Sequence, residues 1–397
     1  MKILHVTPEF QHPLVRGSDR HYHLLRELST RHEITLLTLA RAEISDEAMQ
    51  EVQGRTCQSF VIDVTAHEIK NRLPTAIGRR LQREWQFRKG LSRMKGTFQR
   101  LTRNESFDVV LFHGKSVFPV IHDFSALPIV TDFCDATSFR IRNKMRYAGK
   151  AKAPLLMLRY LKVRATEKKM IEKSSQLFFI TRRDREKILG PEDLSSIVSN
   201  GIDLDYWQRK DNNPRPNCLI FTGVMDYGPN EDAAIFLIDE ILPLLKQTRP
   251  EVEIMIAGRS PTPALLQRAQ RHPEVTVTGF VEDMRSYLEQ AAIFVAPLRY
   301  GSGQQNKILE ALAMEVPVVT TPMTEEGVRV DDRQAPPLCV AESAPDFARS
   351  VHQLLHQPSE RARLAVQGRQ YVQDHFSWSQ SARQVESMCV EVLEGQR

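Results

Sequence analysis

The sequence lacks the features of a disulfide-stapled, zinc-binding or membrane-spanning protein. Its 397 residues include only five cysteines, which lie far apart and form neither a Cys-x-x-Cys pair nor a Cys/His cluster with metal-ligand spacing. No run of 18 or more apolar residues occurs, and the chain opens on the strand pattern Met1–Val6 rather than a signal segment. We therefore expect a cytoplasmic protein without disulfides, structural zinc or a membrane span.

Two common nucleotide-binding motifs are also missing. The sequence contains no Gly-x-Gly-x-x-Gly and no Gly-x4-Gly-Lys-Ser/Thr. A dehydrogenase of the Rossmann type needs the first motif to hold its dinucleotide. Its absence argues strongly against that class.

The charged residues are unevenly distributed. The formal net charge is +5, yet residues 70–103 contain eleven Lys/Arg against one acid, and residues 140–173 contain twelve against two. The rest of the chain is consequently acidic. Two basic segments in the first half predict a surface for an anionic partner, such as lipid, nucleic acid or an acidic substrate.

Short β-branched runs alternate with helical stretches along the whole chain, which is typical of parallel sheets with helices on both faces. The segment 211–216 is polar and contains two prolines, and a second α/β series follows it. We expect an α/β protein of two doubly wound, Rossmann-like domains facing a cleft, at 1–210 and 211–375. The C-terminal helix, about 376–397, is expected to pack back on the first domain. The strands predicted for the first domain are 2–6, 33–39, 59–64, 107–112, 128–131, 176–180 and 196–198. Those predicted for the second domain are 218–221, 252–256, 275–278, 293–296 and 316–320.

The segment Ala296–Thr321 carries the densest group of candidate site residues. A buried strand is followed by a glycine-containing loop and a helix that begins near Asn306, an arrangement that directs backbone N–H groups at an anion. Lys307 can add a positive charge toward phosphate, and Glu310 can accept hydrogen bonds from a ribose diol. The alternative is an ordinary strand-loop-helix crossover with surface charges.

This segment closely resembles the donor-binding region of family 4 glycosyltransferases, which have the two-domain GT-B fold. Within that family, the Gly-Ser-Gly-Gln-Gln-Asn-Lys loop and Tyr227–Asn230 most resemble sugar transferases of bacterial exopolysaccharide clusters. The resemblance spans nearly the whole chain and is most specific in the second half. The further matching segments are Leu111–Gly114, Val198–Asp203, Phe221–Gly223, Ile256–Arg259 and Val277–Val281.

The resemblance implies roles for residues of the second domain. Glu310 corresponds to the second glutamate of the family's E-x7-E signature and would anchor the ribose of a nucleotide sugar. Ser302 takes the place of the first glutamate, which usually contacts the donor sugar, so the sequence departs from the family there. The resemblance also implies that Val281 marks the loop receiving the nucleobase. Gly303 and Asn306 join this donor-binding set.

Two further candidates of the second domain stand where strands end. Gly223 lies where a side chain would hinder a diphosphate from approaching backbone amides, although a turn glycine is as good an interpretation. Arg259 follows a strand and a glycine and suits phosphate oxygens, although a surface arginine is the simpler interpretation. Both Arg259 and Lys307 are expected to act on the diphosphate during catalysis.

Candidates in the first domain are weaker. The resemblance places Gly17 and Ser18 over the diphosphate and gives His113, at the end of a strand, a contact with the donor sugar. A structural histidine is the competing interpretation of His113. Asp132 and Asp135 follow the next strand and are candidates either for acceptor hydroxyls or for capping a helix.

A basic amphipathic helix is predicted over residues 77–101. Its apolar residues recur at helical spacing while arginines and lysines occupy the other positions. One interpretation is a core helix with a solvated basic face. The other is an interfacial helix at anionic lipid, where each basic residue contributes about 1 kcal/mol. Nucleic-acid binding is disfavoured because no recognised binding module is present.

The resemblance implies a hexosyltransferase-type glycosyltransferase of the EC 2.4 class. It would transfer a sugar from a UDP- or GDP-sugar to a glycan or lipid-linked hydroxyl acceptor with retention of configuration, in the cytoplasm or at the inner face of the cell membrane. The reaction would need no metal or other cofactor. The alternatives are a non-catalytic nucleotide-sugar-binding protein, suggested by Ser302, and a GT-B-fold nucleotide-sugar epimerase.

Overall fold

The computed structural model describes residues 1–13, 19–65, 76–147, 153–210, 214–330 and 333–395. The chain divides into two compact units: unit 1 comprises Met1–Ser199 and Trp378–Arg397, and unit 2 comprises Asn200–Ser377. The expected Gly17 and Ser18 lie outside the described residues.

The division between the units differs from the predicted boundary after residue 210. Residues 200–210 belong to unit 2 because the Ile202 amide donates to the Phe376 carbonyl and Arg209 donates to the carbonyls of Glu289 and Glu315. Phe376 belongs to unit 2 for the same reason. Hydrogen bonds between residues so far apart in the sequence leave no trace in its composition, which shows only the proline-containing segment further along.

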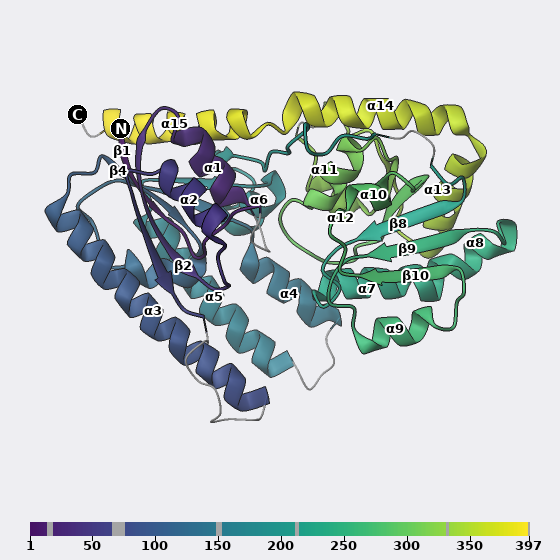
Figure 1. Ribbon diagram of the computed structural model, residues 1–397, viewed down its shortest axis with the longest axis horizontal. Coiled ribbons are helices and arrows are strands. Elements are labelled where there is room, and N and C mark those ends of the chain that lie inside the picture. The colour runs from purple at the N-terminus through teal and green to yellow at the C-terminus, as the bar shows by residue number, and fades with distance from the viewer. Residues whose placement is uncertain (14–18, 66–75, 148–152, 211–213, 331–332, 396–397) are drawn as a thin grey trace. The chain divides into compact units, whose positions relative to one another are not determined.

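Unit 1 contains a seven-stranded, fully parallel sheet in the order β3-β2-β1-β4-β5-β6-β7 (Figure 1). The central strands are buried on both faces, as parallel strands with helices on either side must be. The order reverses between β1 and β4, so their carboxyl ends form the topological switch point. The strands are β1 (Lys2–Val6), β2 (Glu33–Ala40), β3 (Gln58–Asp63), β4 (Val109–His113), β5 (Ile129–Cys134), β6 (Gln176–Phe179) and β7 (Ser196–Ile197).

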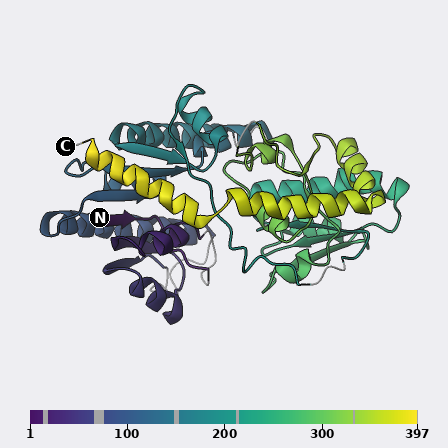
Figure 2. The same cartoon turned by 90° about the horizontal axis from the view of Figure 1, so that it is seen from above.

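Helices cover both faces of this sheet through two separate apolar clusters. One cluster joins the sheet to α1, α2 and α15, and Figure 2 shows α15 lying across unit 1. The other joins the sheet to α3, η1, α5 and α6. The predicted return of the C-terminal helix to the first domain is therefore observed. The helices are α1 (Arg20–Leu28), α2 (Asp46–Gly54), α3 (Ala76–Asn104), η1 (Lys115–Val120), α4 (Thr137–Tyr147), α5 (Ala153–Lys173), α6 (Arg182–Leu189) and α15 (Trp378–Glu394).

The predicted basic helix corresponds to α3, and its two halves differ in burial. In its C-terminal half Met94, Phe98 and Leu101 are buried against the sheet. In its N-terminal half the side chains of Leu81 and Trp85 are exposed to solvent. The apolar stripe therefore continues past the core that it was expected to cover.

Unit 2 contains a six-stranded parallel sheet in the order β10-β9-β8-β11-β12-β13, with its switch point between β8 and β11. Both sheets therefore have the doubly wound topology that the sequence predicts. The strands are β8 (Cys218–Thr222), β9 (Glu253–Ala257), β10 (Val275–Gly279), β11 (Ile293–Ala296), β12 (Val318–Thr320) and β13 (Cys339–Val340).

One predicted helix of unit 2 is interrupted. The sequence predicts a continuous helix over residues 231–246, but a π-helical turn, η3, separates α7 from α8. Pro243 lies in the first turn of α8 and has no N–H to continue the α-helical bonding. The helical segments are α7 (Gly228–Phe236), η3 (Leu237–Ile241), α8 (Leu242–Thr248), α9 (Pro263–Ala269), α10 (Arg285–Leu288), α11 (Asn306–Ala313), α12 (Pro322–Glu326), α13 (Ala344–His356) and α14 (Pro358–His375).

A helix that crosses a bilayer must be long and predominantly apolar. Among the described residues, none combines enough length with enough apolar character to do so.

Candidate functional site

The candidate donor site lies at the carboxyl ends of parallel strands in unit 2. Gly223 follows β8, Gly258 and Arg259 follow β9, Gly279 ends β10, and the loop 297–305 connects β11 to α11. The carboxyl ends of parallel strands meet at one edge of a sheet, where ligands of open α/β sheets bind. The fold thus places several sequence-predicted residues at the same edge.

Two glycine-containing turns approach each other closely at this edge. A Cβ atom built on Gly258 would lie 1.8 Å from the Gly223 carbonyl oxygen, and the backbone φ of Gly258 is +142°. A Cβ built on Gly223 would lie 2.6 Å from Nδ2 of Asn230 and 2.9 Å from Nζ of Lys307. Glycine at both positions therefore keeps backbone within reach of a ligand and leaves room for polar side chains.

Lys307 and Asn230 meet beside Gly223. Lys307 Nζ donates to Asn230 Oδ1 at 2.5 Å and lies 4.7 Å from the centroid of the Phe221 ring. Asn230 Nδ2 donates to the Val224 carbonyl at 3.0 Å, which fixes the orientation of the amide. Burial lowers the pKa of Lys307 to about 7, although the nearby Glu310 carboxylate opposes that shift. Burial therefore disfavours the charged form of Lys307, and an anion bound beside it would favour that form.

The loop before α11 is held by Asn200. The Asn200 amide nitrogen donates to Gln304 Oε1 at 2.8 Å, and its side-chain Nδ2 donates to Asn306 Oδ1 at 2.9 Å. Gly303 adopts a left-handed φ of +71°, and Ser302 is buried with its carbonyl accepting from Gln305 Nε2 at 3.3 Å. The start of α11 is therefore positioned by hydrogen bonds to Asn200 as well as by a bond within the loop.

The remaining predicted donor residues lie around this edge. Glu310 is half-buried one turn after Lys307, and its charge reaches the Tyr206 hydroxyl and Lys307. Arg259 is half-buried, and its carbonyl accepts from the Met225 amide at 2.9 Å. Val281 is half-buried two residues after the end of β10.

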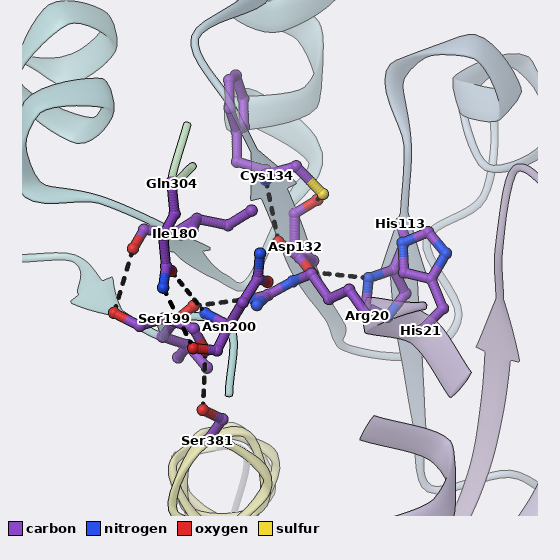
Figure 3. A network of polar contacts seen from close by, with 12 residues as sticks. Arg20, His21, His113, Asp132, Cys134, Ile180, Ser199, Asn200, Gln304 and Ser381 are labelled. Carbon is purple, nitrogen blue, oxygen red and sulfur yellow. Dashed lines mark hydrogen bonds and ion pairs between the residues drawn. The ribbon is translucent and has the colours of Figure 1, made fainter. Parts of the chain in front are cut away.

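His113 and Asp132 form a buried pair in unit 1 (Figure 3). His113 Nδ1 lies 3.0 Å from Asp132 Oδ2, and Arg20 Nε donates to that same oxygen at 2.7 Å. Burial opposes the ionisation of Asp132, but Arg20 and His113 outweigh it and hold the pKa of the carboxyl well below its usual range. Asp132 Oδ1 also accepts from the Cys134 amide at 2.9 Å. Asp132 is therefore ion-paired with Arg20 and orients the His113 imidazole at the end of β4.

Two more histidines contact this pair at the switch point of unit 1. The ring centroids of His5 and His21 lie 4.7 Å and 4.5 Å from that of His113. Neither ring nitrogen of His5 has a hydrogen-bond partner, and His113 Nε2 and His21 Nδ1 are also unpartnered. Burial lowers the pKa of all three imidazoles, so they are neutral at pH 7.

The expectations for Asp132 and Asp135 have different outcomes. Asp132 is a strand residue, so it does not cap a helix, and it is fully buried. Asp135 is half-buried and accepts from the Thr137 hydroxyl at 2.7 Å immediately before α4. The Lys115 ammonium lies 3.7 Å from Asp135 Oδ1. Asp135 thus contacts the first residue of α4, while Asp132 contacts the buried His113.

A metal site is disfavoured in the histidine cluster. The ligand atoms of His21, His113 and Asp132 come within 4.8 Å of one another. Arg20 already occupies the Asp132 carboxylate at 2.7 Å, and its positive charge repels a cation. The residues as arranged fit an internal ion pair better than a metal.

Sequence reasoning missed Arg20, His5, His21, Asn230 and Asn200 as participants in these arrangements. Arg20 is the first residue of α1, and its side chain is buried. Asn230 and Asn200 belong to segments that resemble family 4 glycosyltransferases, but the sequence alone assigns neither residue a role. Only the pairing of distant residues in the fold identifies them.

Known proteins resemble this chain in sequence and in fold. Residues 216–357 match the family model described as glycosyl transferases group 1. Glycogen synthase of Mycobacterium tuberculosis is 27% identical over 210 residues, which are 51% of this chain and 50% of that protein. The chain thus spans about half the length of the curated relatives it matches.

Solved structures share the fold over nearly the whole chain. Sucrose-phosphate synthase from Thermosynechococcus elongatus has a TM-score of 0.70 at 14% identity, covering 99% of each chain. HepE from Anabaena in complex with UDP has a TM-score of 0.66 at 12% identity, covering 98% of this chain and all of that chain. Taken with the two sheets, these matches show that the chain has the two-domain Rossmann-like GT-B fold, with the match to glycosyl transferases group 1 confined to residues 216–357.

Proposed function

We propose that the chain is a glycosyltransferase of the EC 2.4 class that uses a nucleotide-sugar donor. The observation that carries this proposal is the convergence of Gly223, Asn230 and Lys307 at the carboxyl end of β8. The matching group 1 domain covers this region, and the similar HepE structure contains UDP. Together they favour a pyrophosphate at the edge of the unit 2 sheet.

The proposed chemistry follows from the charge that develops during transfer. As the bond between sugar and phosphate breaks, negative charge grows on the leaving diphosphate. Lys307, backbone amides near Gly223 and the start of α11 would stabilise that charge, with Arg259 as a second cation. Glu310 would hold the ribose, and Ser302 and Gly303 would border the sugar. Retention of configuration, with a leaving phosphate oxygen accepting the acceptor's proton, belongs to the same proposal.

The finer assignments extend this proposal. Transfer of a hexose from UDP- or GDP-sugar, membership of family 4 and a place in exopolysaccharide synthesis rest on the resemblance of the Gly301–Lys307 loop. Unit 1 would bind a glycan or lipid-linked acceptor, with His113 contacting the donor sugar. A lipid-linked acceptor would bring the enzyme to a membrane surface, at the inner face of the cell membrane.

A non-catalytic nucleotide-sugar-binding protein is the second candidate. Ser302 favours it, because a serine hydroxyl cannot supply the charge of the glutamate that it replaces. The two candidates share the donor site and differ only in turnover. Release of UDP from a bound UDP-sugar in the presence of a lipid or glycan extract would distinguish the enzyme from the binding protein.

The donor site itself is tested by thermal shift with UDP, GDP and ADP. A nucleotide at 100 times its dissociation constant adds about 2.7 kcal/mol of stability, which raises the unfolding temperature measurably. Glu310→Gln should lose most of that shift, whereas Glu240→Gln, an exposed carboxylate on η3 of the same unit, should retain it. An absence of any nucleotide shift in the wild-type protein would refute the proposed function.

A further inference from the structure

The outward face of α5 is apolar in a way that packing in unit 1 does not explain. Leu155, Leu158 and Leu161 are 65%, 67% and 55% exposed, and Met157 is 46% exposed. These positions cover one arc of the helix, since residues three apart share a face. The opposite face holds the half-buried Leu156, Tyr160 and Val163, which continue into the buried Met170. Soluble proteins seldom leave so many neighbouring large apolar side chains in water.

The first half of α3 shows the same feature independently. Leu81 and Trp85 are 64% and 54% exposed and lie four residues apart on one face. Lys89 Nζ lies 5.3 Å from the centroid of the Trp85 ring. The second half of the helix is buried against the sheet. Both helices therefore anchor their C-terminal halves in the core and extend apolar N-terminal halves away from it.

The two exposed faces belong to the same side of unit 1. Both α3 and α5 pack against η1 and join the same apolar cluster of the sheet. Figure 1 shows the first turns of both helices at the lower edge of unit 1. The two stripes can therefore meet one extended surface.

The charge around both stripes has one sign. Residues 153–166 of α5 contain no acid and three bases, Arg159, Lys162 and Arg164, all exposed. In α3 the only acid is Glu84, and its Oε1 lies 3.2 Å from the Arg88 guanidinium. Leucine and tryptophan flanked by an excess of lysines and arginines are typical of helices that lie in an anionic lipid interface.

We propose that the first halves of α3 and α5 form one membrane-binding surface of unit 1 that docks on anionic lipid. The exposed leucines and Trp85 enter the headgroup boundary, and the flanking bases contact lipid phosphates. A second copy of this chain is a poor occupant, because two such faces would bring like charges together. Nucleic acid would pair with the bases but leave the leucines in water. The surface is independent of the donor site.

Vesicle co-sedimentation of the full chain without substrate tests this surface. We use vesicles of phosphatidylcholine alone and of phosphatidylcholine with phosphatidylglycerol. The α5 variant carries Leu155→Gln, Leu158→Gln and Leu161→Gln, and the α3 variant carries Leu81→Gln and Trp85→Gln. Glutamine is a good helix former, so the exposed helices are retained. The control carries Leu194→Gln and Val366→Gln, which replace exposed apolar residues at 89% and 64% elsewhere.

The wild-type protein and the control should bind the anionic vesicles and bind phosphatidylcholine weakly. Each test variant should lose about tenfold or more of the partition coefficient, since burial of an apolar side chain stabilises by over 1 kcal/mol. Unaltered circular dichroism would confirm that the variants are folded. Equal binding by all variants, or no vesicle binding at all, would overturn the proposal. Self-association that the α5 variant abolishes, without vesicle binding, would assign the face to a second copy instead.

Discussion

At the scale of single residues, the donor site depends on groups that cannot be exchanged for larger or differently charged ones. Gly258 has no space for a side chain, because the Gly223 carbonyl occupies the position of its Cβ. Lys307 holds a charge that its surroundings disfavour. Both features leave the edge of the sheet ready for a diphosphate.

Gly258→Ala should destabilise unit 2 by about 3 kcal/mol, because the new methyl group collides with backbone rather than with a movable side chain. Urea denaturation monitored by circular dichroism measures the loss. Gly96→Ala is the control: Gly96 lies within α3, and a Cβ there meets nothing within 4 Å. Alanine at that site should stabilise unit 1 by about 0.5–1 kcal/mol. Equal stability of the two variants would show that the close approach at Gly258 is not rigid.

Lys307 should make nucleotide binding depend on pH. Its pKa of about 7 in the free protein must rise when a diphosphate adds negative charge, so binding takes up a proton. UDP affinity should fall between pH 7 and pH 9, approaching about tenfold per pH unit.

Isothermal titration in two buffers of different ionisation enthalpy counts the proton taken up. Lys307→Arg should remove the pH dependence, since the guanidinium stays charged throughout. Lys307→Met should bind weakly at every pH. A wild-type affinity that is constant from pH 7 to pH 9 would contradict the assignment of Lys307 to the diphosphate.

The sequence predicts residues at the donor edge better than it predicts their partners. The strand ends and the start of a helix can be predicted from the local sequence pattern, and these positions include Gly223, Lys307 and Glu310. The bond between Lys307 and Asn230 joins residues 77 positions apart, and that between Asn200 and Asn306 joins residues 106 apart. Which side chains meet at these separations depends on the order of the strands in the sheet. That order cannot be predicted from a single sequence.

At the scale of elements, the histidine cluster lies at the switch point between the paired strands β1 and β4 of unit 1. His5 comes from β1, His113 from β4 and His21 from α1, so the cluster joins the two halves of the sheet at its switch point. A strand pattern predicts that His113 ends a strand. It does not predict that His5 and His21 meet it.

The cluster should make unit 1 less stable in mild acid. Burial holds the folded pKa of each imidazole below 6.5, so the unfolded chain binds protons that the folded chain excludes. Stability is then fully present above pH 6.5 and is lost as the pH falls below it, by at most about 1.4 kcal/mol per pH unit for each histidine.

Urea denaturation at pH 7.5, 6.5 and 5.5 measures this loss. His5→Leu should reduce the pH dependence and keep the stability at pH 7.5, because His5 makes no hydrogen bond through its ring nitrogens. His122→Leu removes an exposed histidine and serves as the control. A pH profile that His5→Leu leaves unchanged would show that the cluster does not govern acid stability.

The elements themselves were largely predictable, and the exceptions have physical causes. Alternation of apolar strands and amphipathic helices predicts twelve of the strands, because each buried strand is a short β-branched run. The two-residue β13 was missed because so short a strand leaves no periodic signal. The interruption at η3 was missed because Pro243 sits within an otherwise regular helical pattern.

At the scale of the whole molecule, unit 1 is assembled from two separate stretches of chain. Its sheet and most of its helices precede unit 2 in the sequence, whereas α15 follows unit 2. Trp378 at the start of α15 stacks on His23 of α1 with ring centroids 4.6 Å apart. The sequence predicts that the C-terminal helix packs on the first domain, but it does not predict which residues the helix contacts.

The position of α15 in the chain sets an order for synthesis. A ribosome releases the first 199 residues long before it makes residues 378–394, so the apolar face of α1 that α15 covers stays open while all of unit 2 emerges. Unit 2 is continuous and can complete its own core in that interval. Unit 1 therefore begins to fold before unit 2 and is completed after it. The apolar face of α1 stays exposed to solvent, and so to chaperones, until α15 is made.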